Sequence, residues 1–125
     1  MSAPNAFSPS NVAIRSGAVS LTTTATTLLL GNAASSGHAY RVVAIRACNN
    51  SITATTVTLS YLPASSTGVG TSYHLAQGTI INGFSYLDML DTQHPCYLEE
   101  NTSLAIANNN TAIVVDVFYS YEDIS

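Results

Sequence analysis

The sequence predicts an all-β fold, arranged as a single antiparallel sandwich or barrel. Short segments rich in β-branched and aromatic residues alternate with turn residues at near-regular spacing. No stretch carries the sustained apolar repeat at i, i+3, i+4, i+7 that predicts a helix. A chain of 125 residues also fits one domain and is long enough to bury its own core.

The expected strands follow one another from Ala18 to the C-terminal region. Each is a run with strand propensity that is bounded by Gly, Pro, Asn or Ser. They are Ala18–Thr22, Thr26–Leu30, Tyr40–Asn49, Thr55–Leu62, Ser72–Ala76, Thr79–Ile81, Ser85–Leu90, Cys96–Leu98, Ser103–Ala107 and Ala112–Tyr121.

The breaks between these strands have physical causes. Gly31-Asn32 and Ser35-Ser36-Gly37 tolerate positive φ, and Pro63 cannot donate a hydrogen bond to a ladder. Asn82-Gly83 is a strong signal for a two-residue hairpin. These positions predict turns.

Alternation predicts which side chains face the core. Val57, Leu59 and Tyr61 share one face of their strand, as Leu104 and Ile106 do in theirs. The run Arg41–Cys48 is apolar on both faces, with Val43, Ile45 and Ala47 opposite Val42, Ala44 and Cys48. That strand is therefore expected to be central or covered by a neighbouring subunit.

The first residues differ from the rest of the chain in composition. Residues 1–17 contain Pro4 and Pro9 with little apolar density, which predicts an extended arm, and residues 18–125 form the β domain. The N-terminus lacks the basic start and the apolar segment that would predict a signal peptide. No apolar run approaches the roughly 20 residues of a membrane helix.

Charge is scarce. Charged residues make up 8% of the chain, against about 25% in typical domains. The cations are three arginines, there is no lysine, and the net charge is −4. Nucleic acid and anionic membranes both require basic clusters, so neither is an expected partner. The composition favours a protein packed against copies of itself or partners, although neutral hydroxyl and amide groups could also hydrate a free surface.

Candidate chemical sites are weak. Asp88, Asp91 and His94 would converge on a helical turn, but on a strand residues at i and i+3 point to opposite faces. Serines lie in no nucleophile elbow, and the histidines have no zinc-ligand spacing. No catalytic residue, metal ligand or cofactor site is predicted. Cys48 and Cys96 could pair, but Cys48 is expected to be a buried, inert thiol.

The last strand places Asp116 amid apolar residues. Asp116 shares a face with Val114, Phe118, Ser120 and Glu122, and this face is expected to be the wetter one. Val114 and Phe118 there predict a contact surface for a neighbouring protein. An ion pair between Asp116 and Arg41 or Arg46 would be structural.

Several segments together resemble small structural proteins of tailed-bacteriophage virions. The similarity runs from about Leu21 to the C-terminus through residues 40–49, 54–61, 73–78, 85–91, 97–104 and 115–124. Its most specific parts are the Tyr97-Leu98-Glu99-Glu100 turn and the Ser120–Ile124 ending. The chain departs from the pattern at Asn101, where Gly is common, but Asn also tolerates left-handed φ.

The resemblance implies a non-enzymatic β-sandwich with jelly-roll character. It predicts a capsid decoration (cement) protein that forms a symmetric homo-oligomer, with a trimer favoured, and binds the major capsid protein or other virion proteins. A tail, neck or head-fibre adaptor is the alternative within the virion. The expected assembly residues are Pro4, Phe7, Pro9, Arg15, Val114, Asp116 and Phe118.

A function of another class is a carbohydrate- or receptor-binding sandwich. Tyr73, His74 and Tyr86 lie near expected loop tips, and tyrosine combines apolar area with a polar tip. The chain has no tryptophan, which is the largest stacking surface for a sugar.

Overall fold

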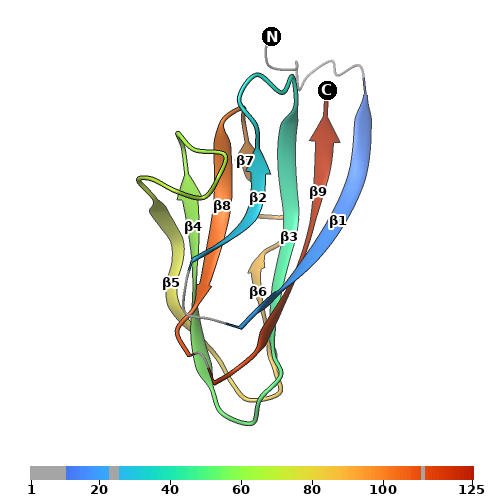
Figure 1. Ribbon diagram of the computed structural model, residues 1–125. Coiled ribbons are helices and arrows are strands. Elements are labelled where there is room, and N and C mark those ends of the chain that lie inside the picture. The colour runs from blue at the N-terminus through green and yellow to red at the C-terminus, as the bar shows by residue number, and fades with distance from the viewer. Residues whose placement is uncertain (1–10, 23–25, 111) are drawn as a thin grey trace.

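Two antiparallel sheets form the protein. The computed structural model describes residues 11–22, 26–110 and 112–125, which form nine strands and no helix. Sheet I has the order β1-β9-β3-β6, with β7 also paired to β3, and sheet II has the order β2-β8-β4-β5 (Figure 1). The strands of sheet I are β1 (Val12–Leu21), β3 (Ala39–Asn49), β6 (Tyr86–Leu90), β7 (Cys96–Leu98) and β9 (Val115–Ile124). Those of sheet II are β2 (Thr27–Asn32), β4 (Thr55–Leu62), β5 (Tyr73–Ile81) and β8 (Thr102–Asn108).

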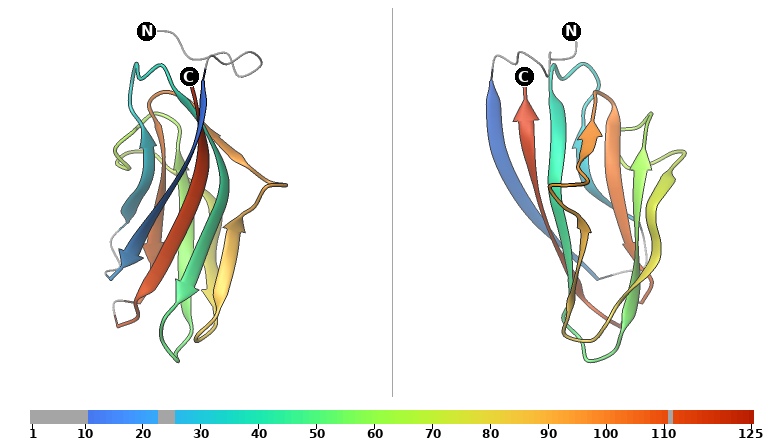
Figure 2. Two further views of the ribbon diagram at one scale, coloured as in Figure 1. Left: turned by 90° about the vertical axis from the view of Figure 1, so that its right-hand side faces the viewer. Right: turned by 180° about the vertical axis from the view of Figure 1, so that it is seen from behind.

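The strand order is that of a jelly roll. β4 pairs with β5, β3 with β6 and β7, β2 with β8, and β1 with β9, so the chain makes one long antiparallel ribbon. Wrapping that ribbon brings β9 beside β3 and β8 beside β4. β6 and β7 follow each other along β3 and take one strand position between them. The jelly-roll sandwich expected from the sequence is thus confirmed, and Figure 2 shows its two layers.

The core lies between the sheets. Val57, Leu59, Leu104 and Ile106 are fully buried, and Tyr61 packs against them, as alternation predicted. Burial of these side chains is the main favourable contribution to stability, at about 25 cal/mol per Å² of apolar surface.

β3 is a central strand, as expected, but its predicted faces were wrong at two positions, Val42 and Val43. A register shift between Val42 and Ala44 adds one residue to the strand. Val42, Ile45 and Ala47 therefore point inward and are fully buried, while Val43 turns outward. A bulge of this kind reverses alternation locally and cannot be read from a period of two.

The first strand begins earlier than expected. Val12–Leu21 pairs with β9 along its whole length, so residues 12–17 belong to the sheet rather than to the arm. β9 extends to Ile124 and offers a backbone edge there, and hydrogen bonding to that edge does not need the apolar density that marks a strand in sequence. Residues 1–10, which include the rest of the predicted arm, lie outside the described residues.

Two predicted breaks differ in the structure. The segments expected at Ser72–Ala76 and Thr79–Ile81 are one strand, β5, in which Gly78 has a φ of 60° and the register against β4 shifts. Asn82-Gly83 is not a two-residue hairpin, because β5 and β6 lie in different sheets. The turn there passes from one sheet to the other, and the Ser85 amide donates to the Asn82 carbonyl.

Three buried asparagines hold the loops at the strand ends. The Asn49 side-chain amide donates to the carbonyls of Thr53, Ile81 and Asn82, which joins two loops. Asn32 and Asn108 act in the same way at other strand ends, and all three are fully buried. Buried amides satisfied by backbone carbonyls fix loop positions that apolar contacts alone leave free.

Turn geometry agrees with several local predictions. Ser35 and Gly37 have positive φ values, and Asn101 adopts a φ of 59°, as expected at the position where a glycine is common. Gly31 was expected in a turn, but it lies inside β2. No helix in the part of the chain that the structure describes is long and apolar enough to cross a membrane.

Candidate functional site

The outer face of sheet I carries an aromatic side chain at its centre. The register aligns Ala18 on β1, Phe118 on β9, Arg46 on β3 and Asp88 on β6 in one row across the sheet. Phe118 keeps 48% of its surface exposed, between the small Ala18 and the long Arg46. An exposed ring at the middle of a sheet, far from any strand end, is the kind of apolar anchor that interfaces use.

A shallow groove of about 340 Å³ runs beside this ring. Its wall is mostly apolar, with Val43 and Ala44 turned outward by the β3 bulge and Leu90 from β6. Arg46, Asp88, Asp91 and Thr92 complete the rim. The bulge in β3, which alternation did not predict, therefore supplies part of the wall of this groove.

The charges on this face are paired. Arg46 Nε and Nη2 donate to both oxygens of Asp88, at 2.7 and 3.2 Å, and the guanidinium lies 4.1 Å from the centroid of the Tyr86 ring. The hydrogen bond from Arg46 lowers the pKa of Asp88, and the same bond raises the pKa of Arg46. A neutralised pair beside exposed aromatic groups is easier to bury against a partner than a lone charge.

Asp116 is held without an ion pair. It accepts hydrogen bonds from the Ser20 hydroxyl and from the Asn50 side-chain amide. The ion pair with Arg41 or Arg46 that the sequence allowed does not form in the described structure, where Arg41 pairs with Glu122 at 3.4 Å and Arg46 pairs with Asp88. Asp116 is therefore an anchor for β1 and for the loop after β3.

The predicted assembly residues fall into three groups. Val114, Asp116 and Phe118 are exposed and lie along one side of the last strand. Arg15 points to the opposite face of sheet I, where it donates to Asp123 at 3.1 Å. Pro4, Phe7 and Pro9 lie outside the described residues.

The connection between β4 and β5 covers part of the outer face of sheet II. Residues 63–72 fold back over the sheet, so that Leu62 is only 2% exposed although it points away from the core. A β-carbon on Gly31 would overlap the Ser66 carbonyl oxygen, so this glycine lets the connection approach β2. Below the connection Ser103 is fully buried, and its hydroxyl has no hydrogen-bond partner within the described residues.

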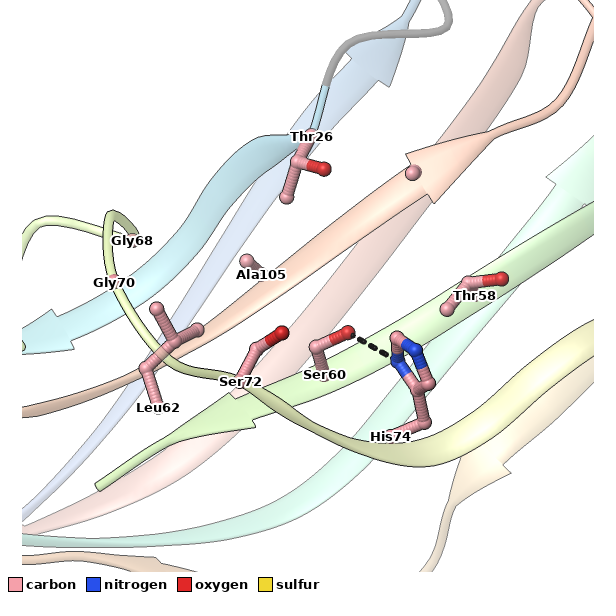
Figure 3. A pocket seen from close by; sticks show the side chains of 10 residues that line it. Thr26, Thr58, Ser60, Leu62, Gly68, Gly70, Ser72, His74 and Ala105 are labelled. Atoms are coloured by element: carbon pink, nitrogen blue, oxygen red, sulfur yellow. Dashed lines mark hydrogen bonds between the residues drawn. The ribbon is translucent and has the colours of Figure 1, made fainter.

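A polar pocket remains beside this cover. It measures about 180 Å³, and within it Ser60 Oγ lies 2.9 Å from His74 Nδ1 (Figure 3). A serine beside a histidine can be part of a nucleophilic site, but a third group must orient the imidazole. The residues that line this pocket include no carboxylate, and Ser60 lies inside a regular strand. The described lining thus holds a serine–histidine pair without the third group that an acyl-transfer site requires.

The Asp88–His94 stretch has two separate structural roles. Asp88 pairs with Arg46 on the sheet, while Asp91 accepts hydrogen bonds from the backbone amides of Gln93 and His94 in the following turn. The Asp91 pKa is lowered, first by the hydrogen bond from the His94 side chain. The divergence of the two carboxylates that strand spacing predicted was wrong, because Asp91 lies in the turn after β6, both residues line the groove beside Phe118, and the Asp91 charge opposes the lowering of the Asp88 pKa. Among the described residues no three His, Cys, Asp or Glu side chains group to hold a metal ion.

The cysteines are unpaired. Cys48 and Cys96 are both free thiols. Burial raises the pKa of the Cys96 thiol. Cys48 was expected to be buried, but it is only partly so, because it lies on the outer side of sheet I in register with Asp116.

The residues suggested for a sugar platform do not converge. Tyr73 and His74 are neighbours on β5 and point to opposite faces, while Tyr86 lies on the other sheet. The Arg46, Tyr86 and Asp88 cluster was missed by the sequence analysis, since strand pairing brings these residues together. The signal in the sequence was the presence of two cations, Arg41 and Arg46, within the largely apolar β3 run.

Comparisons with known proteins gave few matches. No protein-family model matches the chain, and no curated protein matches it. Among solved structures, the chain is similar to one described as "Cyanophage Pam1 capsid asymmetric unit". That match has 20% sequence identity and a TM-score of 0.36, and it covers 98% of this chain and 91% of the other.

Proposed function

We propose that this chain is a non-enzymatic structural protein of a bacteriophage virion, and specifically a capsid decoration protein. In this proposal it assembles as a symmetric homo-oligomer, with a trimer favoured, and clamps neighbouring major capsid subunits. The observation that carries the proposal is the exposed, charge-paired outer face of sheet I around Phe118. The jelly-roll fold, which capsid domains often use, agrees with the resemblance noted in the sequence, although fold alone does not define function.

The surface chemistry supports packing against other proteins. Phe118 and Tyr86 on sheet I are 48% and 59% exposed, Val114 directly before β9 is 41% exposed, and Arg46 beside the two rings is neutralised by Asp88. Interface centres are typically depleted in unpaired charge and enriched in aromatic residues and arginine. A stable interface buries about 800 Å² per partner, and a sheet of five strands offers an area of that order.

Sheet edges give a second reason for assembly. Among the described strands β1 pairs only with β9, so its other edge leaves backbone groups available to a partner, and Ile14 on this strand is 83% exposed. A long unprotected edge promotes aggregation in a monomer, whereas a closed oligomer can cover it. β1 and Phe118 belong to the same outer face, so one interface could include both.

The test is the number and location of copies on purified virions. Quantitative protein analysis and cryo-EM should find hundreds of copies spread over the shell. A few copies in rings at one vertex would instead identify the tail, neck or head-fibre adaptor. Absence from purified particles would overturn both forms of the proposal.

The arm has its own test. Residues 2–10 precede β1, so their deletion leaves every paired strand in place, whereas a longer deletion would remove part of β1. If the arm adds reach along the capsid, the truncated protein should remain folded and should occupy fewer sites on particles. Unchanged occupancy would remove the arm from the proposal and leave the sheet I face as the binding surface.

A further inference from the structure

We infer that the pocket on the outer face of sheet II is a binding site for a small neutral polyhydroxyl ligand, of the size of one sugar ring. This inference does not rest on the proposed function, because it concerns the opposite face of the sandwich and a different class of partner. It begins with the register of sheet II, which aligns Leu28, Ala105, Ser60 and His74 in one row.

The shape of the pocket comes from small residues beneath a folded connection. Ala105 and Ala107 on β8 form a floor with no bulky side chain, and Gly68 and Gly70 in the connection border the space above it. Figure 3 shows Thr26 on the other side of Ala105 from Ser60 and Ser72. The volume of about 180 Å³ is below that of typical drug-sized sites, so it fits one ring rather than an extended chain.

Hydroxyl and imidazole groups converge on this space. Ser60 and His74 share one hydrogen bond at 2.9 Å, which leaves the imidazole Nε2 to donate or accept. Thr58 Oγ1 accepts from the Gly78 amide at 3.0 Å, so the Thr58 hydroxyl proton is still available. The hydroxyls of Thr26 and Ser72 bond to no other residue in the described ranges. The site therefore offers several groups that can both donate and accept.

The lining selects a neutral ligand. None of the described residues that line the pocket is Asp, Glu, Lys or Arg. A charged ligand would lose hydration without gaining a counter-ion, which is unfavourable. A polyhydroxyl ring instead matches donors with acceptors at its edge and places its C–H groups on the alanine floor. No Phe, Tyr or Trp ring is among the described residues that line the site, so the affinity should be weak, in the millimolar range.

Titration with neutral monosaccharides, observed by NMR, tests the inference. With the full chain, at least one hexose should shift the amide signals of Ser60 and Ser72 and the imidazole signals of His74 in a saturable way. Methyl glycosides of the same sugar distinguish the source of the ligand: binding that survives the anomeric methyl group indicates the terminal residue of a glycan, and binding that it abolishes indicates the free sugar.

Variants separate the pocket from the rest of the surface. Ser60→Ala and His74→Ala should each weaken binding about tenfold, the equivalent of one lost hydrogen-bonding group. Ala107→Leu fills the floor without removing a polar group and should abolish binding. Ser16→Ala and His94→Ala are matched controls on exposed strand and turn positions and should leave binding unchanged. Absence of saturable shifts with every sugar, or equal binding by Ala107→Leu, would overturn the inference.

Discussion

The outer faces of the two sheets are built alike, each with a row of four residues across its strands, but they differ in how far the chain covers them. On sheet I the central row is Ala18, Phe118, Arg46 and Asp88, and it is open to solvent. On sheet II the corresponding row is Leu28, Ala105, Ser60 and His74, and residues 63–72 fold over the part of the face beside it, where Leu62 and Ser103 are buried. The chain thus covers part of one outer face with its own connection and leaves the central row of the other open to solvent.

The largest difference should appear when an apolar side chain is removed from each face. Leu62 points outward from sheet II but is buried, so Leu62→Ala should lower the free energy of unfolding by about 2–5 kcal/mol. Phe118→Ala removes a half-exposed ring and should lower the free energy of unfolding far less. Chemical denaturation of both variants measures this, and equal losses would show that the two faces are buried alike.

A contact at Gly31 tests how closely residues 63–72 pack against sheet II. Gly31→Ala sets a β-carbon against the Ser66 backbone carbonyl, and this should cost about 1–3 kcal/mol in unfolding free energy. Gly17→Ala is the matched change on sheet I, where the new atom meets only the Tyr119 side chain. That ring can move, so the Gly17 variant should lose less stability. The reverse order in denaturation would mean that the connection is not fixed by Gly31.

Ser103 gives a change of the opposite sign. Its buried hydroxyl lacks a partner among the described residues, so Ser103→Ala removes an unsatisfied group. Stability should stay the same or rise by up to about 1 kcal/mol. Thermal unfolding measures the effect, with Ser60→Ala as a control that breaks a formed hydrogen bond. A clear loss in Ser103→Ala would indicate that a bound water satisfies this hydroxyl beneath the cover.

The smallest effect concerns the paired charges on sheet I. The pKa of Asp88 is lowered from 3.8 by Arg46, so the carboxylate stabilises the folded state above that pH. This stabilisation is lost as the pH falls through the lowered value in the folded protein. Asp88→Asn should therefore reduce stability slightly at neutral pH and not at the lowest pH values. The effect is small because the pair is exposed, and an equal loss at both ends of the pH range would contradict it.

Local sequence signals predicted much of the framework. Alternation identified Val57, Leu59, Leu104 and Ile106 as core residues, because a period of two depends on the strand alone. Asn101 likewise adopts the left-handed φ expected at its turn. The bulge after Val42 and the early start of β1 were missed, since both depend on the edge that β9 provides.

The candidate sites were harder to predict for the same reason. Phe118 and Val114 were recognised as surface residues of the last strand, because one strand determines their face. Arg46 meets Asp88, and Ser60 meets His74, only through pairing between strands. The cover over Leu62 depends on Gly31, whose role is a close approach to Ser66 rather than the expected turn. No local pattern encodes such contacts.

The central claim is that the open face of sheet I is an assembly surface, and sedimentation velocity over a concentration series tests it most directly. The account predicts that the wild-type protein sediments as an oligomer, with a trimer expected, at concentrations where Phe118→Ala is a folded monomer. Phe84→Ala is a matched control, since this ring is also exposed but lies in the turn between the sheets. If the wild-type and Phe118→Ala proteins sediment alike at every concentration, the claim is contradicted.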